Sequence, residues 1–127
     1  MTTLEQVHSD TAPAAIGPYS QAIKSGSLVF LSGQIPLDPK SMVIVQGGVA
    51  EQTHQVFRNL AAVAEAAGGS LSNAVKLTIY VIDLGDFATV NEIMAEYFSE
   101  PYPARATIQV SALPKGSTVE IDAILSL

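Results

Sequence analysis

Two residues in the last quarter of the chain carry the side chains best suited to handling a small organic acid. Arg105 and Glu120 stand on consecutive segments that alternate apolar and polar residues. The planar guanidinium of arginine donates two parallel, charge-assisted hydrogen bonds to a carboxylate, and a glutamate can accept a proton from an attacking water. The other arginine, Arg58, lies among polar residues of a predicted helix and fits a solvated face. The residues alone leave open a second interpretation of Arg105, an internal ion pair with Glu120 or Asp122.

Three more polar residues are candidates for the same site. Tyr19 and Ser32 lie on a predicted hairpin. Asn91 follows Phe87 by four residues and precedes Met94 by three, which predicts a position inside the apolar stripe of a helix. A buried amide without partners costs roughly 1–3 kcal/mol. Asn91 therefore either serves the site or pins a loop.

The composition excludes several kinds of chemistry. The chain has no cysteine, which removes disulfides, thiolate metal sites, iron–sulfur clusters and cysteine nucleophiles. His8 and His54 form no ligand pair, so we expect no metal site. The serine-elbow, dinucleotide and phosphate-loop motifs are all missing from the sequence. A net charge of -6 makes nucleic acid a disfavoured partner, because that affinity comes from clustered Lys and Arg.

The elements that must position the candidate residues follow from the apolar periodicity. Strands are predicted at 19–24 and 28–32 around a turn at 25–27, then a loop over 33–48, a helix over 50–67 and a strand over 74–82. A second helix begins at Asp83 or Asp86 and ends before Pro101, and two strands follow. This order predicts one α+β domain over 1–127, with both helices on one face of a single sheet. The opposite face is predicted to hold Thr78, Tyr80, Arg105, Thr107, Gln109 and Glu120.

The charged fraction is unusually low, at 14% where about 25% is typical of soluble domains. No stretch approaches the ~18 consecutive apolar residues of a membrane span, and the N-terminal segment resembles neither a signal nor a transit peptide. We therefore expect a cytoplasmic homo-oligomer that covers its apolar surface with copies of itself. The alternative is a monomer with a large apolar core.

The sequence resembles the reactive intermediate deaminase (Rid) family, also called the YjgF-like family, in several motifs that run from about residue 16 to the end. Two lie near the hairpin, IGPYSQA at 16–22 and FLSGQIP at 30–36. The predicted helices contribute matching residues at 52–53, 59–60, 66–68, 86–87, 91 and 97–98. The C-terminal signature runs from 103–105 through 113–114 to 119–121.

This resemblance implies a fold, an activity and a set of roles. The family fold is a chorismate-mutase-like α+β domain that forms homotrimers with ligand clefts between subunits. Its best-known activity hydrolyses 2-imino acids such as 2-iminobutanoate and 2-iminopropanoate, and their enamines, to 2-keto acids and ammonium without a metal or cofactor. By position, Arg105 would bind the substrate carboxylate and Glu120 would activate the water. Lining the cleft would be Tyr19, Ser32, Asn91 and Thr107.

Position 107 departs from the family, because many members carry cysteine there. If this position contributes its backbone carbonyl, Thr107 serves equally well, since every residue has one. If the thiol itself matters, activity falls. Two other functions remain as alternatives. One is a non-catalytic module that binds 2-keto acids or other small carboxylates. The other is an endoribonuclease, as proposed for some relatives, which the acidity and the lack of a histidine pair disfavour.

Overall fold

The computed structural model describes residues 3–127, and within that range the strands form one six-stranded sheet in the order β1-β2-β3-β6-β4-β5. β4 and β5 run parallel, and the other neighbours are antiparallel. The chain order is β1 (Leu4–Val7), β2 (Ala22–Ser25), β3 (Leu28–Gln34), α1 (Val49–Ala66), β4 (Ala74–Val81), α2 (Phe87–Tyr97), β5 (Ala104–Gln109) and β6 (Val119–Ser126). Short 3-10 turns are η1 (Leu71–Asn73), η2 (Leu84–Asp86) and η3 (Pro114–Gly116).

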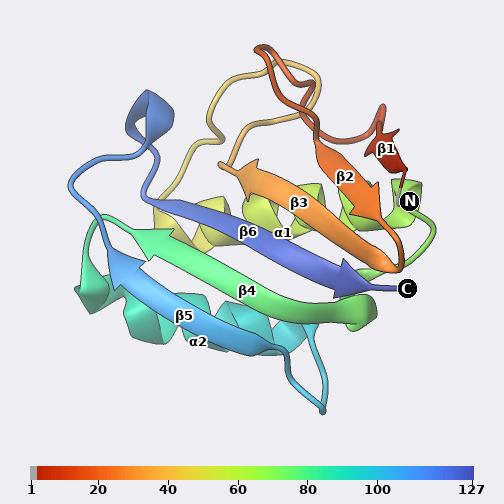
Figure 1. Ribbon diagram of the computed structural model, residues 1–127. Coiled ribbons are helices and arrows are strands. Elements are labelled where there is room, and N and C mark those ends of the chain that lie inside the picture. The colour runs from red at the N-terminus through yellow and green to blue at the C-terminus, as the bar shows by residue number, and fades with distance from the viewer. Residues whose placement is uncertain (1–2) are drawn as a thin grey trace.

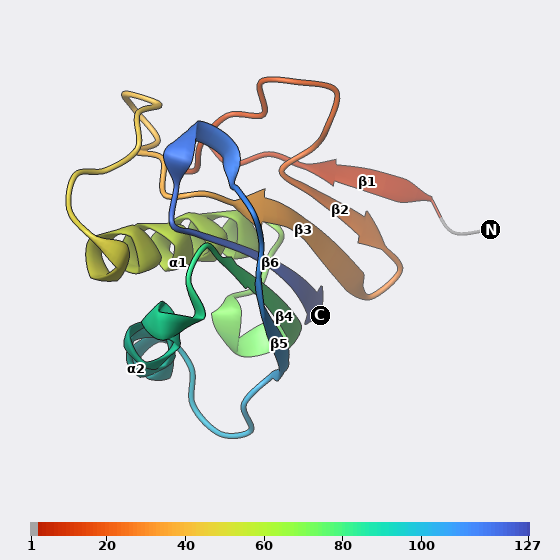
Figure 2. The same ribbon diagram turned by 90° about the vertical axis from the view of Figure 1, so that its left-hand side faces the viewer.

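Both helices cover the same face of the sheet (Figures 1 and 2), as predicted. The stripe of α1 that contains Val56, Leu60 and Val63 is fully buried, and the helix packs on β3, β6 and α2. Its ends lie within one residue of the predicted ones. Gly68 follows it with a φ of +94°, a backbone conformation that glycine adopts without steric penalty.

The central strands bury alternate residues under the helices. Leu77, Ile79 and Val81 of β4 are buried, and so are the matching residues of β6 from Val119 to Leu125. Each large aliphatic side chain buried in this way contributes roughly 1.5–3 kcal/mol. The residues between them, including Tyr80 and Glu120, lie on the opposite, open face.

One prediction about the open face is wrong. Arg105 pairs with Leu77, and Thr107 pairs with Ile79, so both point toward the helices rather than away from them. Gln109 pairs with Val81 and lies on the same side. Alternation of apolar and polar residues separates the two faces of a strand but does not say which face meets the helices. In the edge strand β5 the apolar residues, Ile108 among them, lie on the open face, away from the helices.

The open face carries apolar side chains that no part of residues 3–127 covers. Phe30 is 44% exposed and Ile108 is 45% exposed, although both lie in regular strands. Figure 2 shows that no helix lies over this side. The apolar surface that the low charged fraction of the sequence predicted therefore includes the open face of the sheet.

The first strands differ from the prediction at their N-terminal ends. β2 begins at Ala22 rather than Tyr19, because the Tyr19 N–H closes a tight turn with the Gly17 carbonyl at 2.8 Å. β1 was not predicted. Its four residues are mostly exposed, which leaves no alternation to detect. Among residues 3–127, no helix is long and apolar enough to cross a membrane.

Candidate functional site

Arg105 begins the edge strand β5 and is held in place by α2. Its Nη1 donates to Asn91 Oδ1 at 2.5 Å and lies 3.6 Å from Met94 Sδ. The guanidinium carbon lies 5.2 Å from the centre of the Phe87 ring, a cation–π contact. Within residues 3–127, the other N–H groups of the guanidinium have no partner. Arg105 is thus a fixed cation with donors free for an incoming anion.

Asn91 is exposed, which corrects its predicted place inside the apolar stripe of α2. The buried stripe is narrower than the spacing suggested and comprises Val90, Ile93 and Met94. Asn91 therefore lies at its rim, where its carbonyl oxygen accepts from Arg105 instead of pinning a loop.

Thr107 is the next residue of β5 on the same side as Arg105. It lines a hollow together with Arg105, Phe87 and Leu84. Its hydroxyl oxygen is buried and has no hydrogen-bond partner in the described part of the chain. Gln109 supports this hollow from the end of the strand, because its Oε1 accepts from the Leu84 N–H at 3.0 Å.

Glu120 lies on the open face of β6 and lines a separate hollow of about 290 Å³. Tyr19, half exposed, and Lys115 line it too; its other walls are mostly apolar, formed by Pro13, Ile16, Ile35, Leu37 and Pro114. Burial, and secondly the charge of Asp122, raises the pKa of the Glu120 carboxyl above its usual range. A carboxyl of this kind is suited to taking up a proton.

Ser32 ties the hairpin together and does not line this hollow. Its hydroxyl donates to the Ser20 carbonyl at 2.6 Å, and its N–H donates to the Gln21 carbonyl at 3.0 Å. These bonds fix the segment that carries Tyr19. Of the two residues predicted on the hairpin, Tyr19 therefore lines the hollow, and Ser32 supports the segment that carries Tyr19.

Three buried amides position the Glu120 hollow, and none of them was predicted as a site residue. Gln21 Nε2 donates to the carbonyls of Ser9 and Pro13. Gln52 Oε1 accepts from both the N–H and the hydroxyl of Thr118, the residue before β6. Asn59 Nδ2 donates to the carbonyls of Ile35 and Leu37. The sequence held one indication of this role: each of these amides lies within a family motif, at a position that the structure buries.

The two main candidate residues do not meet within one chain. Arg105 lies on the helix side of β5, Glu120 lies on the open side of β6, and β4 runs between these strands. In the part of the chain that the structure describes, Arg105 forms no ion pair with Glu120 or Asp122, so that interpretation of the arginine is wrong. Each residue instead belongs to its own hollow.

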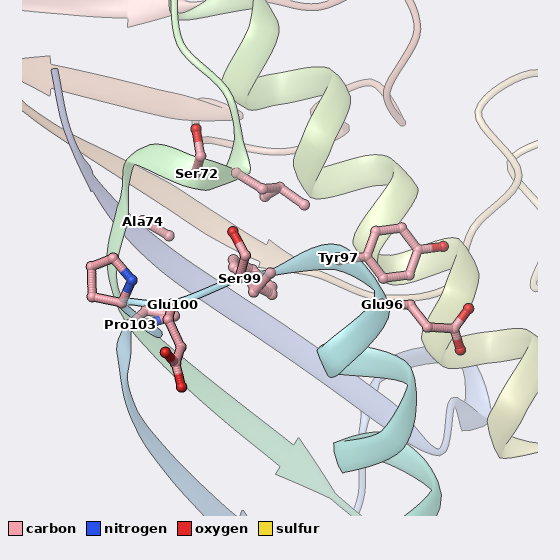
Figure 3. Close-up of a pocket in the computed structure, with 10 residues that line it drawn as sticks. Ser72, Ala74, Glu96, Tyr97, Ser99, Glu100 and Pro103 are labelled. Atoms are coloured by element: carbon pink, nitrogen blue, oxygen red, sulfur yellow. The ribbon is translucent and has the colours of Figure 1, made fainter.

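Another hollow lies at the C-terminal end of α2, but its polar groups do not converge. Ser72, Glu96, Ser99 and Glu100 are among its lining residues. Figure 3 shows the Glu96 and Glu100 carboxylates pointing to different sides. Residues 3–127 also hold no cluster of three or more potential metal ligands.

The chain is similar to known proteins over most of its length. The profile of the family described as Endoribonuclease L-PSP matches residues 9–126. The chain is 59% identical to Protein DfrA of Myxococcus xanthus, over 93% of this chain and 92% of that one. It is 50% identical to the human 2-iminobutanoate/2-iminopropanoate deaminase, over 89% of this chain and 82% of the human one. The crystal structure of RidA from the Antarctic bacterium Psychrobacter sp. PAMC 21119 superposes with a TM-score of 0.93 at 50% identity, covering 97% of this chain and 99% of that one.

The fold and these matches define an α+β protein with one sheet and two helices, like its Rid structural neighbours. The chain belongs to the Endoribonuclease L-PSP family, which is the YjgF-like or Rid family that its motifs resemble.

Proposed function

We propose that the protein is a homotrimeric deaminase that hydrolyses 2-iminobutanoate and 2-iminopropanoate in clefts between adjacent subunits. The observation that carries this proposal is the separation of Arg105 and Glu120 onto opposite faces of the sheet, each in its own hollow. A fixed cation and a proton-accepting carboxyl make a complete site only when one chain supplies the first and a neighbour the second. The names of the mammalian relatives support the same activity.

A closed ring of three chains would bring Arg105 of each chain to Glu120 of the next. A head-to-tail interface joins two different surfaces of the same chain and closes when the rotation permits. Turning the open faces toward the axis of this ring, so that each chain contacts the next, would cover Phe30 and Ile108, which are close to half exposed in the single chain. The Arg105 hollow, at the edge strand, then lies next to the Glu120 hollow of the adjacent subunit.

Arg105 fixes the substrate in this mechanism. Its free N–H groups bind the carboxylate of the 2-imino acid, and the Asn91 carbonyl and the Phe87 ring hold the guanidinium still. Thr107 lies beside the bound acid and offers its unpartnered hydroxyl and its backbone. Holding the carboxylate in this way places the C2 carbon where a water can reach it.

Glu120 completes the reaction from the other side of the cleft. As the water oxygen bonds to C2 of the iminium, Glu120 takes one proton of the water and the C=N π electrons move to nitrogen. Glu120 passes that proton to the nitrogen, and the C–N bond breaks with its electron pair leaving on ammonia. As C=O forms, Glu120 takes the hydroxyl proton and passes it to the ammonia, which leaves as ammonium. One iminium and one water give one 2-keto acid and one ammonium. Tyr19 borders the same hollow and shapes it, with Ser32 supporting its segment.

The test is a trapping assay with a threonine or serine dehydratase as the source of imine. Semicarbazide traps the imine before water does, so an active deaminase lowers the semicarbazone signal. We expect the wild-type protein to suppress trapping and R105A to lose this effect. R58A, which removes an exposed arginine of α1, is the matched control and should behave as wild type. Unchanged trapping with the wild-type protein would overturn the proposal.

A binding module for small carboxylates is the second candidate, because the Arg105 hollow is already formed in a single chain. The E120Q variant separates the two functions. If the protein is a hydrolase, E120Q loses turnover and keeps most of its affinity for 2-ketobutanoate. If it is a binding module, the wild-type protein already shows saturable binding without turnover.

A further inference from the structure

Glu120 is one member of a group of three polar side chains on the open face of the sheet. The strand register places Glu120 directly opposite Tyr80 of β4 and places Asp122 directly opposite Thr78. The Tyr80 hydroxyl donates to Asp122 Oδ2 at 3.0 Å, not to the glutamate beside it. Tyr80 is partly buried, and its strand β4 is paired on both sides, with β6 and with β5.

The two carboxyls of this group have unlike surroundings. Asp122 accepts the hydrogen bond of the Tyr80 hydroxyl and is tied to β4 by it. Glu120 has no hydrogen bond or ion pair with any residue from 3 to 127. Of the two carboxyls, Asp122 is therefore held in place by a hydrogen bond, and Glu120 is the one left free at the hollow.

Among the described residues that line the hollow or flank Glu120 on this face, Asp122 carries the other carboxyl. The ionisable side chains that face it are Tyr80 from β4, Asp122 from β6, Tyr19 from the segment before β2 and Lys115 from η3. β3 contributes Gly33 and Gln34, which do not ionise. Burial first, and then the bond to Asp122, raises the pKa of the Tyr80 hydroxyl, so this group remains a donor.

We propose that Asp122 is a positioning residue for the reaction: held by the Tyr80 hydroxyl, its fixed charge makes the Glu120 carboxyl the group that takes the proton of the attacking water. The inference rests on the proposed function, because it assigns the origin of the reactivity of Glu120 at that same site. Asp122 acts through Glu120 and does not touch the substrate.

The first test measures Glu120 directly and needs no activity. The D122N substitution removes the charge, keeps the shape and keeps an oxygen that can accept from Tyr80. We expect the titration midpoint of the Glu120 side-chain carboxyl, followed by ¹³C NMR and assigned with E120Q, to fall by roughly half to one pH unit. E65Q removes the same charge from the exposed side of α1 and should leave the midpoint unchanged.

The second test follows the pH dependence of imine hydrolysis. The acid limb of kcat/KM should move to lower pH in D122N by the same amount as the midpoint, and by less in Y80F, which keeps both charges. An unmoved midpoint in D122N, or a Y80F shift as large as that of D122N, would overturn the inference. If the wild-type protein shows no hydrolysis but D122N still shifts the Glu120 midpoint, the proposed function is overturned. The coupling of the two carboxyls is then supported on its own.

Discussion

Gly33 leaves the space that the carboxyl of Glu120 occupies. A Cβ atom at position 33 would lie 2.7 Å from Glu120 Oε2 and 3.0 Å from its Cδ. The glycine is needed here for space rather than for an unusual backbone angle, because its φ is not in the left-handed region. The overlap involves the end of a side chain, so a larger residue displaces the carboxyl rather than the strand.

The G33A variant should therefore fold normally and lose activity. Displacing a reacting group by about 1 Å can reduce the rate by about 100-fold, and we expect kcat to fall by roughly 10-fold to 100-fold with little change in Tm. Trapping assays and thermal melts measure the two effects. G17A is the control, since its Cβ meets only the Tyr19 ring at an ordinary 3.6 Å. Full activity in G33A would contradict the placement of Glu120.

The N91D substitution places a carboxylate where Arg105 now meets an amide oxygen. It should strengthen the contact with the guanidinium and at the same time compete with the substrate carboxylate. We expect N91A to lose about 10-fold in kcat/KM, from one hydrogen bond to a charged group, and N91D to lose more without a lower Tm. Steady-state kinetics and melts of both variants test this. Equal or better activity in N91D would show that Arg105 does not bind the substrate carboxylate.

The raised pKa of Glu120 predicts that this residue opposes stability at neutral pH. A carboxyl whose pKa is higher in the folded than in the unfolded chain stabilises the fold at low pH, and this contribution is lost as the pH rises through the folded pKa. E120Q should therefore be inactive and yet melt at a higher temperature than wild type at pH 7. The difference should shrink as the pH falls toward 4.5, the ordinary value for glutamate. Calorimetry of wild type and E120Q across this pH range measures the difference in Tm, with E65Q as the control. A lower Tm for E120Q than for wild type at pH 7 would contradict the prediction.

Assembly and activity should be lost together when a charge enters the open face. Ile108 is 45% exposed on this face, and Val43 is 62% exposed in the loop before α1. We expect wild type to sediment at about three times the 13.3 kDa chain mass and I108D to sediment as the single chain without activity. V43D should match wild type in both respects. An assembled and active I108D would exclude the open face as the interface.

The helices and the central strands could be predicted from the sequence, because their apolar residues recur at a fixed period against one core. Glu120 was placed on the correct face because its neighbours in β6 are clearly apolar. Arg105 was not, because the edge strand β5 is apolar on the side away from the helices. Asn91 was assigned to the core because spacing gives a direction around a helix but not the width of the buried stripe.

The location of Arg105 and Glu120 on opposite faces of one sheet has a genetic consequence. If each cleft takes its arginine from one chain and its glutamate from the next, two inactive alleles can restore function to each other. Cells that express R105A and E120Q chains in equal amounts would assemble mixed trimers in which about one cleft in four holds both intact residues. Neither allele alone would produce any such cleft.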